Sequence, residues 1–361
     1  MAGRRARARE ERARKVRRRW IGAIVALAIV VALVVAAAML LPRLIDRFSG
    51  PEDYAGPGTG EVVVQVQPGQ NGGQIARTLA EQDVIASAEA FTDILVADPS
   101  IQLHPGAYRL QLQMPAQAAL DALRDPANRV EVRVTIPEGF MLPQVYERLE
   151  RDTGIPQADF LRAGGDPSAF GLPAGATNLE GWLFPATYTF DDGVTAEAIL
   201  ETMVDRTRQA LAQHGVADAD AQRVLTFASL VQREAGEVEN FAKVARVFQN
   251  RLDIGMLLQS DATVAYGTGN THVVTTTPEE RADADNPYNT YIHPGLPVGP
   301  IGAPSDEAIT AVLEPAEGDW LFFVTVNLET GETVFSETAA EHAVGVRQFQ
   351  EWYREHPEYH G

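Results

Sequence analysis

One carboxylate in the chain has the sequence setting that a general acid requires. Residues 219–236, ADAQRVLTFASLVQREAG, have the apolar periodicity of a helix. Phe227 and Val231 lie on its apolar face, and Glu234 follows at three- and seven-residue spacing on that same face. A carboxyl among apolar neighbours is desolvated, which disfavours its charged form and raises its pKa. The pattern therefore indicates a proton donor that works near neutral pH.

That interpretation of Glu234 competes with a plainer one. A glutamate near the end of a helix is usually a solvated surface residue, as we expect of Glu237 and Glu239, and the spacing is equally compatible with both. Three further segments favour a site around Glu234: NLEGWLFPATYTF (178–190), QSDATVAYG (259–267) and NPYNTYIHPGLP (286–297).

These three segments share aromatic, amide and hydroxyl side chains, with Pro and Gly fixing the loops. Aromatic faces pack against the apolar faces of sugar rings, although they also fill protein cores. Polar groups on rigid loops suit a polyhydroxyl ligand. Taken singly, each segment is more simply an ordinary structured loop, so only their combination strengthens the case for a binding site.

Several other chemistries lack their sequence signatures. The chain has no cysteine, which excludes disulfides, thiol catalysis and cysteine-ligated metals. The seven histidines are scattered without a paired metal-ligand spacing, so we expect no metal site. No phosphate-binding or dinucleotide glycine motif and no serine-nucleophile motif is present, and we expect no cofactor.

Charge is distributed unevenly along the chain. Residues 1–19 hold ten of the 30 Lys and Arg and two of the 49 Asp and Glu. The remainder therefore has 20 basic against 47 acidic residues, a net charge of −27. Such an acidic part repels nucleic-acid phosphates, so we expect no nucleic-acid partner.

An uncharged apolar run follows the basic residues. Residues 20–41, WIGAIVALAIVVALVVAAAMLL, match the length of about 20 residues that crosses a bilayer as a helix. Positive charge marks the cytoplasmic side, so we expect a cytoplasmic tail at 1–19, a transmembrane helix at 20–41 and an extracytoplasmic remainder. A cleaved signal peptide ending near Ala36-Ala37-Ala38 is the alternative; a buried core helix would need a polar face.

The remainder indicates an α+β fold in two parts after a Gly- and Pro-rich linker at 42–60. The first part is a small α+β unit, whose expected strands are 62–66, 107–112 and 129–136 and whose expected helices are 73–82, 86–97 and 115–123. The second has expected helices at 142–151, 195–214, 219–236, 241–255 and 339–354 and a late strand pair at 320–326 and 333–335. We place the boundary between 61–130 and 131–361.

Four segments resemble the endolytic murein transglycosylases, the MltG or YceG-like family. They are LEGWLFPATYTF (179–190), ASLVQREAG (228–236), VFQNRLDIGMLLQSDATVAYG (247–267) and NPYNTYIHPGLPVGPIGAPS (286–305). Their order and separations also match, and the resemblance extends from about residue 62 to the C-terminal helix. This chain departs from the family pattern at Gln232-Arg233 and at Ser260, where Thr is commoner, and neither change affects the carboxylate.

The resemblance implies a bacterial inner-membrane lyase that cleaves the bond from N-acetylmuramic acid to N-acetylglucosamine within nascent glycan strands. Its implied catalytic residue is Glu234, and the unit at 61–130 looks like the family's LysM-like, glycan-binding subdomain. The implied partners are peptidoglycan glycan strands and the cell-wall synthases, or penicillin-binding proteins, whose products it shortens. The residues expected around the cleft are Glu180, Asn250, Arg251, Gln259, Asp261, Tyr266, Tyr288, Asn289 and Tyr291.

The implied reaction needs only one carboxyl group. Glu234 protonates the glycosidic oxygen, the muramyl 6-hydroxyl attacks its own anomeric carbon, and a 1,6-anhydro end forms without water. Ordinary glycosidases need a second carboxylate. Two alternatives stay open: a hydrolytic muramidase that pairs Glu234 with Glu180 or Asp261, and a non-catalytic glycan-binding scaffold for synthases in which Glu234 is structural.

Overall fold

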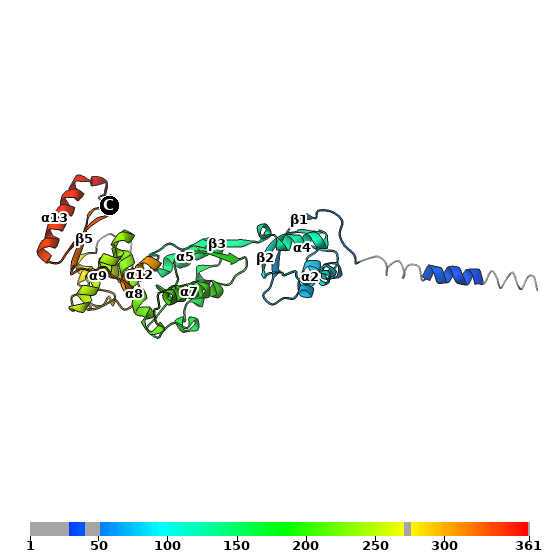
Figure 1. The fold of residues 1–361 in the computed structure, drawn as a ribbon, viewed down its shortest axis with the longest axis horizontal. Coiled ribbons are helices and arrows are strands. Elements are labelled where there is room, and N and C mark those ends of the chain that lie inside the picture. The colour runs from blue at the N-terminus through cyan, green and yellow to red at the C-terminus, as the bar shows by residue number, and fades with distance from the viewer. Residues whose placement is uncertain (1–28, 40–50, 271–275, 360–361) are drawn as a thin grey trace, which may run out of the picture. The chain divides into compact units, whose positions relative to one another are not determined.

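The computed structural model describes residues 29–39, 51–270 and 276–359, which fall into two compact units, Met1–Val130 and Glu131–Gly361 (Figure 1). Both units combine helices with strands, so the predicted α+β class is confirmed. The predicted tail at 1–19 and residues 42–50 of the predicted linker lie outside the described residues. The LysM-like identity of residues 61–130 stays a prediction.

The smaller unit is a two-stranded antiparallel sheet covered by helices. β1 (Thr59–Val66) pairs with β2 (Gly106–Leu112), with Val64 opposite Tyr108. Inward-facing apolar side chains of both strands pack with the helices around Leu79, Phe91 and Leu120. The helices are α2 (Gly72–Glu81), α3 (Ala88–Ala97) and α4 (Ala116–Arg124), followed by the 3₁₀ turn η1 (Pro126–Asn128).

The described part of the predicted linker is anchored to the smaller unit. Residues 51–58 have no regular secondary structure, as expected of a linker, but β1 already begins at Thr59. The Asp53 carboxylate accepts the backbone N–H of Ala116 at the start of α4, and the Tyr54 hydroxyl donates to Asp83. These hydrogen bonds make residues 52–54 part of the folded unit. The linker predicted at 42–60 is therefore wrong for these residues, because composition alone does not indicate such contacts.

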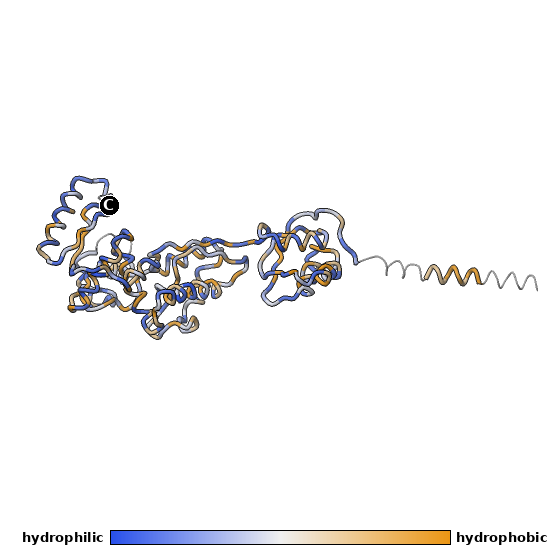
Figure 2. The backbone as a smooth tube through the Cα atoms, in the orientation of Figure 1, coloured by the Kyte–Doolittle hydropathy of each residue, from blue (hydrophilic) through white to orange (hydrophobic). Residues whose placement is uncertain are grey.

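Residues 29–39 form a helix whose apolar side chains are exposed. Figure 2 shows this helix as a continuous hydrophobic stretch. No helix within residues 29–39, 51–270 and 276–359 is long and apolar enough to span a membrane. The predicted span at 20–41 extends past this helix on both sides, outside the described residues.

The larger unit begins with an antiparallel strand pair, and the sequence pattern assigned the first of these strands to the smaller unit. β3 (Glu131–Thr135) pairs antiparallel with β4 (Thr187–Asp191), and α5 (Leu142–Thr153) packs on β3. Assigning the strand at 129–136 to the smaller unit was therefore wrong. Its partner β4 lies in the aromatic segment 178–190, where no strand was predicted, because the aromatic residues there also suit a loop or a core. α6 (Gln157–Ala163), the turn η2 (Pro167–Phe170) and α7 (Ala196–Gln213) complete this part.

A layer of helices follows. α12 (Asp306–Leu313) packs against both α8 (Asp218–Glu234) and α9 (Phe241–Asp253), and buried apolar residues such as Leu230, Phe248 and Ile309 fill the space between them. The predicted helices at 219–236 and 241–255 are confirmed. Three further short helices, like α6 before them, were not predicted, because eight residues or fewer are too short for an apolar periodicity to stand out: α10 (Asp261–Thr268), α11 (Pro278–Arg281) and α12, with the turn η3 (Val238–Asn240) before α9.

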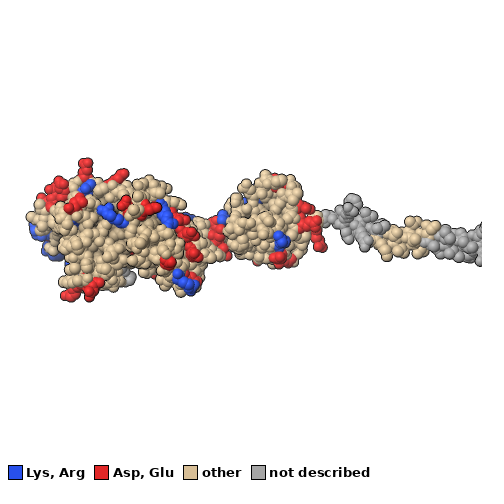
Figure 3. Space-filling view, turned by 90° about the horizontal axis from the view of Figure 1, so that it is seen from below, with Lys and Arg blue, Asp and Glu red and all other residues tan. Residues whose placement is uncertain are grey.

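The chain ends in a hairpin and a helix. The predicted strand pair is confirmed as β5 (Phe322–Asn327) and β6 (Glu332–Ser336), and α13 (Ala339–Glu355) packs across them before the turn η4 (Pro357–Tyr359). Gly345 allows the close approach, because a Cβ there would lie 2.8 Å from the side chain of Val324. Figure 3 shows acidic and basic side chains interspersed on the visible surface of the larger unit.

Candidate functional site

Glu234 is the last residue of α8. The helix ends there because Gly236 adopts a left-handed conformation, φ +63°, which other residues disfavour. The residue is half-buried, so it keeps contact with solvent, while its carboxyl group lies deep among protein atoms. A general acid needs both properties, because it must reach a substrate and must hold its proton.

The carboxyl group of Glu234 is held at the N-terminus of α10. The Ser260 hydroxyl donates a short hydrogen bond to Oε1, and the backbone N–H of Ala262 also donates to the carboxyl group. Ser260 is the N-cap of α10, since its Oγ accepts the backbone N–H of Thr263 at 3.3 Å. The end of one helix therefore places the acid and the start of another orients it.

Opposing effects set the acidity of Glu234. Burial raises its pKa, while the hydrogen bonds from Ser260 and Ala262 and the charge of Arg251 lower it, and Asp261 raises it again. Burial has the largest effect, so the pKa lies above the ordinary range of a glutamate. This agrees with the protonated acid that the apolar helix face predicted.

Arg251 and Asn250, both predicted to contact substrate, hold the segment before β5. Arg251 is buried, and its guanidinium donates to the carbonyl oxygens of Leu321 at 2.7 Å and Leu258 at 2.6 Å. The Asn250 amide donates to two carbonyl oxygens of residues 318–320, at 3.0 and 2.9 Å. In this structure both side chains position the backbone, and Arg251 adds a positive charge beside Glu234.

Asp261 and Tyr291 come together next to Glu234. Asp261 accepts two hydrogen bonds from Arg281, at 2.9 and 2.8 Å, and one from the Tyr291 hydroxyl at 2.8 Å. Thr276 donates to the same carboxylate at 2.7 Å. Burial and then the hydrogen bond to Asp261 raise the pKa of Tyr291, and the charge of Glu234 raises it further, so the phenol stays a hydrogen-bond donor.

Gln259 presents an exposed side chain immediately before the N-cap of α10. Its backbone has φ +53°, a conformation that costs energy for a residue with a Cβ. The strain is held in place because the N–H of Gln259 donates to the carbonyl oxygen of Thr290 at 3.1 Å. Strained residues of this kind cluster at functional sites, and a substrate contact for the Gln259 amide stays a prediction.

A second cluster of polar side chains surrounds Glu180, at the C-terminal end of α10. Glu180 is 2% exposed and accepts the backbone N–H of Leu142, at 2.9 and 3.1 Å, and the Tyr266 hydroxyl at 2.8 Å. Burial raises its pKa to about 7. The rings of Tyr266 and Tyr288 meet edge to face with centroids 4.7 Å apart. This carboxyl joins α5 to α10 and has almost no surface that a glycan could touch.

Asn289 is fully buried within its loop. Its amide nitrogen donates to the carbonyl oxygens of Glu280, Arg281 and Asp283 at 3.3, 3.1 and 2.7 Å. Its amide oxygen accepts the N–H of Tyr291 at 3.0 Å. The predicted substrate contact stays untested, and the contacts in this structure instead make Asn289 the residue that fixes Tyr291 and Arg281.

Several residues of the site were not among those expected around the cleft. Ser260 had a usable signal, since Ser before Asp-Ala-Thr is a helix N-cap pattern. Arg281, Thr276 and Thr290 had none, because polar residues in turn-rich segments give no indication of their partners. Within the described residues, no three His, Asp or Glu side chains come together as a metal-binding group.

Comparison with known proteins places this site in a family. The profile of the YceG-like family matches residues 64–348. The chain is 31% identical over 301 residues to the endolytic murein transglycosylase of Bacillus subtilis strain 168, covering 78% of this chain and 82% of that one. It is 28% identical over 314 residues to the endolytic murein transglycosylase of Streptococcus pneumoniae strain D39, and covers 57% of that protein's length.

A solved structure has a similar fold. The crystal structure of a putative yceG-like protein from Listeria monocytogenes is 30% identical in sequence, with a TM-score of 0.52, and the match covers 80% of this chain and 99% of that one. The matched residues 64–348 include Glu234 with its hydrogen-bond partners at the N-terminus of α10. They also include Glu180 and its partners at the C-terminal end of α10. The chain therefore belongs to the YceG-like family.

Proposed function

We propose that this protein is an endolytic lytic transglycosylase of peptidoglycan that uses Glu234 as its acid and base. The Bacillus and Streptococcus relatives carry the name endolytic murein transglycosylase. The observation that carries the assignment of Glu234 is its carboxyl group, buried enough to raise its pKa and yet part of a half-exposed residue held by two donors.

In the proposed reaction, Glu234 first donates a proton and later accepts one. Glu234 gives its proton to the glycosidic oxygen as the bond from the muramyl anomeric carbon to that oxygen breaks. The muramyl 6-hydroxyl then bonds to the same carbon and returns its proton to the Glu234 carboxylate. The products are a free 4-hydroxyl on N-acetylglucosamine and a 1,6-anhydro-muramyl end, and no water is consumed. The second step is fast because both reacting atoms belong to one sugar.

Hydrogen bonding assigns different tasks to the two oxygens of Glu234. Ser260 Oγ accepts the N–H of Thr263, so its own hydrogen points to Glu234 Oε1. A carboxyl oxygen that accepts this hydrogen bond is a poor place for the acidic proton. We propose that the proton is carried by Oε2 and that this oxygen faces the glycosidic oxygen.

The hydrolytic alternative lacks a suitable second carboxylate. Asp261 accepts four hydrogen bonds, two of them from Arg281, and these contacts occupy both of its carboxylate oxygens. Glu180 is 2% exposed and cannot contact a sugar without rearrangement. The arrangement favours a mechanism with one acting carboxyl group.

The products of the reaction test this function. The full chain would be incubated with uncrosslinked glycan strands, and the new ends would be weighed by mass spectrometry. We expect internal fragments that end in anhydromuramyl sugars, one water lighter than reducing ends. Reducing ends would instead establish a muramidase, and intact strands that remain bound would establish a scaffold.

We also propose that residues 20–41 anchor the protein in the bacterial inner membrane, with the enzyme outside. The support is the uncharged apolar run, the basic residues before it and the exposed apolar side chains of residues 29–39. Because the chain has no cysteine, single cysteines placed on either side of the run would report the topology. Labelling of a cysteine at Ser100 only after the membrane is opened would overturn this proposal.

Glycan binding by residues 61–130 and partnership with synthases are proposed on the family resemblance alone. Co-purification from crosslinked membranes would test the partnership with synthases.

Ser260 gives a prediction with a matched control. Ser260→Ala removes the donor to Glu234, and we expect a fall in kcat of about tenfold, the effect of losing one hydrogen bond to a charged group. The lost donor had favoured the carboxylate, so the pKa of Glu234 rises and the alkaline limb of the rate profile moves to higher pH. Ser260→Thr keeps the hydroxyl and the helix cap, and should retain both the rate and the profile. An alanine variant with an unchanged pH profile would contradict the role given to Ser260.

A further inference from the structure

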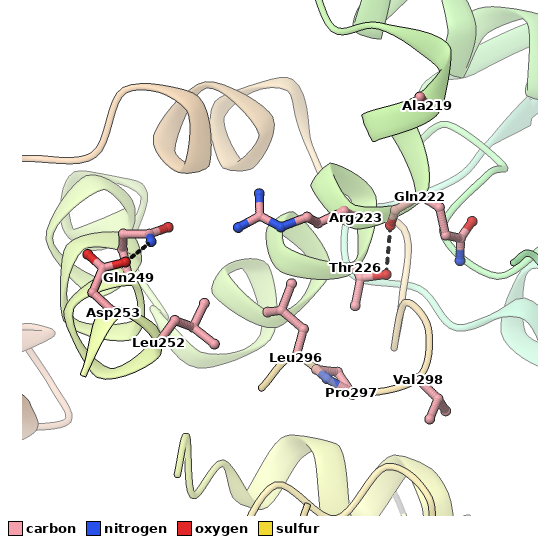
Figure 4. Close-up of a pocket in the computed structure, with 10 residues that line it drawn as sticks. All are labelled: Ala219, Gln222, Arg223, Thr226, Gln249, Leu252, Asp253, Leu296, Pro297 and Val298. Carbon is pink, nitrogen blue, oxygen red and sulfur yellow. Dashed lines mark hydrogen bonds between the residues drawn. The ribbon is translucent and has the colours of Figure 1, made fainter. Parts of the chain in front are cut away.

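A cleft of about 630 Å³ lies along the first half of α8, away from Glu234. Its walls come from α8, from the end of α9 and from residues 296–298 (Figure 4). The volume is within the range of roughly 300–1,000 Å³ that small-ligand sites occupy. The proposed chemistry at Glu234 makes no use of this cleft.

The cleft has a cation on one wall and a carboxylate on another. Arg223 extends from α8 into the space between α8 and α9, and it makes no hydrogen bond or ion pair with the described residues (Figure 4). On α9, Asp253 accepts the Gln249 amide through Oδ1 at 2.6 Å, which leaves Oδ2 available. In an otherwise acidic protein, an unpaired arginine facing a cleft is a candidate for binding a carboxylate.

The remaining lining is neutral and partly apolar. Gln222 accepts the indole N–H of Trp182 with its oxygen, so its amide nitrogen remains available to donate. Leu296, Pro297 and Val298 form an aliphatic side, and Val298 is 62% exposed. This lining suits a short peptide that has both a carboxylate and an ammonium group. It offers donors for the carboxylate, an acceptor for the ammonium group and an aliphatic surface for the rest of the peptide. An uncharged glycan chain would have no need of the two charged groups.

From this lining we infer that the cleft binds the peptide stem of peptidoglycan, with Arg223 on a stem carboxylate and Asp253 on the ammonium group of an uncrosslinked diamino acid. The inference rests on the proposed function, because it takes its ligand from the same substrate. Stems are short peptides of alanine, glutamate and a diamino acid attached to the muramyl sugar, which matches the chemistry of the lining.

The distance between the cleft and Glu234 fits this assignment. Arg223 precedes Glu234 by eleven residues of α8, which at a rise of about 1.5 Å per residue separates them by roughly 16 Å along the helix. An extended peptide of five residues spans about 17 Å. A stem on a muramyl sugar held at Glu234 is therefore long enough to reach Arg223. Crosslinking converts the ammonium group of the acceptor stem into an amide, so this site disfavours stems that have served as acceptors.

The first experiment measures binding without catalysis. The full chain carrying Glu234→Gln would be titrated by calorimetry with a synthetic stem pentapeptide that has free carboxylates and a free side-chain amine. We expect binding that Arg223→Gln weakens at least tenfold and that acetylation of the side-chain amine also weakens. Arg162→Gln, a charge change on the exposed face of α6, should leave binding unchanged. Absence of peptide binding, or equal weakening by Arg162→Gln, would overturn the inference.

A second experiment uses cleavage by the chain with Glu234 intact. Arg223→Gln should raise KM for stem-bearing strands about tenfold, with kcat and the cleavage of stem-free strands unchanged. An equal effect on both substrates would overturn the stem assignment. Failure of the proposed function looks different: a chain that binds the peptide but cuts no strand keeps this binding site and loses the transglycosylase assignment.

Discussion

Glu234→Gln is expected to lower the rate of glycan cleavage by about 10³-fold while strand binding survives. A positioned general acid or base contributes roughly 10²–10⁴ in rate, and Glu234 is proposed to serve in both steps. Glutamine has nearly the same shape and still accepts the hydrogen bonds from Ser260 and Ala262, but it has no proton to give. Initial rates of anhydro-end formation at saturating strand concentration would measure the loss, and cosedimentation with strands would measure binding.

Glu239→Gln is the matched control for this variant. Glu239 lies five residues further along the chain, in the exposed turn η3, and the same change of charge there should leave the rate within about twofold. A Glu234→Gln variant that kept more than a tenth of the cleavage rate would contradict the assignment of the acid. A large loss in both variants would point to a general effect of charge.

The stability of the larger unit is expected to fall as pH rises from about 4.5 to 7, through Glu180. Burial raises the folded-state pKa of this carboxyl from 4.5 to about 7, so between these values the folded protein binds more protons than the unfolded chain. The stabilisation is complete below pH 4.5 and is lost as pH passes 7. A shift of this size corresponds to about 3 kcal/mol.

Comparison with Glu180→Gln isolates the effect of this one group. Glutamine cannot ionise, and its oxygen can still accept from Leu142 and Tyr266. The free energy of unfolding of wild type minus that of the variant, measured in denaturant at pH 5 and pH 8, should therefore decrease by about 3 kcal/mol across that interval. Glu147→Gln, on the exposed side of α5, is the matched control for the loss of one carboxyl group. Parallel curves for wild type and Glu180→Gln would mean that Glu180 is not buried as a neutral acid.

Long elements with strong periodicity were predicted well. α7, α8, α9 and α13 have apolar faces repeated over several turns, and the hairpin of β5 and β6 has Glu-Thr-Gly between two apolar strands. α10 and α12 are eight residues each, too short for periodicity to stand out, and only their serine caps mark them. β3 was assigned to the wrong unit because its partner strand is distant in the sequence: Glu131 pairs with Asp191, 60 residues away, and Thr135 pairs with Thr187, 52 residues away.

The candidate site was predictable in part for a similar reason. The apolar helix face of Glu234 is a local pattern, so its raised pKa followed from the sequence. The contacts of Glu234 with Ser260 and of Glu180 with Tyr266 span 26 and 86 residues, and no local pattern indicates them.

Residue type alone also did not separate substrate contacts from scaffolding. Gln259 is exposed whereas Asn289 is fully buried, yet both are amides in polar loops. Arg251 is a cation in a motif segment, but two backbone carbonyl groups occupy its guanidinium. Burial of a polar side chain depends on the tertiary fold, which is why these roles required the structure.

The most direct test of the account is to run the cleavage in water enriched in heavy oxygen. If Glu234 acts first as acid and then as base on the muramyl 6-hydroxyl, no solvent oxygen enters the product. Mass spectrometry should then show new ends that are one water lighter than reducing ends and carry no heavy oxygen, and no such ends with Glu234→Gln. Reducing ends that each carry one heavy oxygen would contradict the account, because they would show that water, and not the sugar's own hydroxyl, attacked the anomeric carbon.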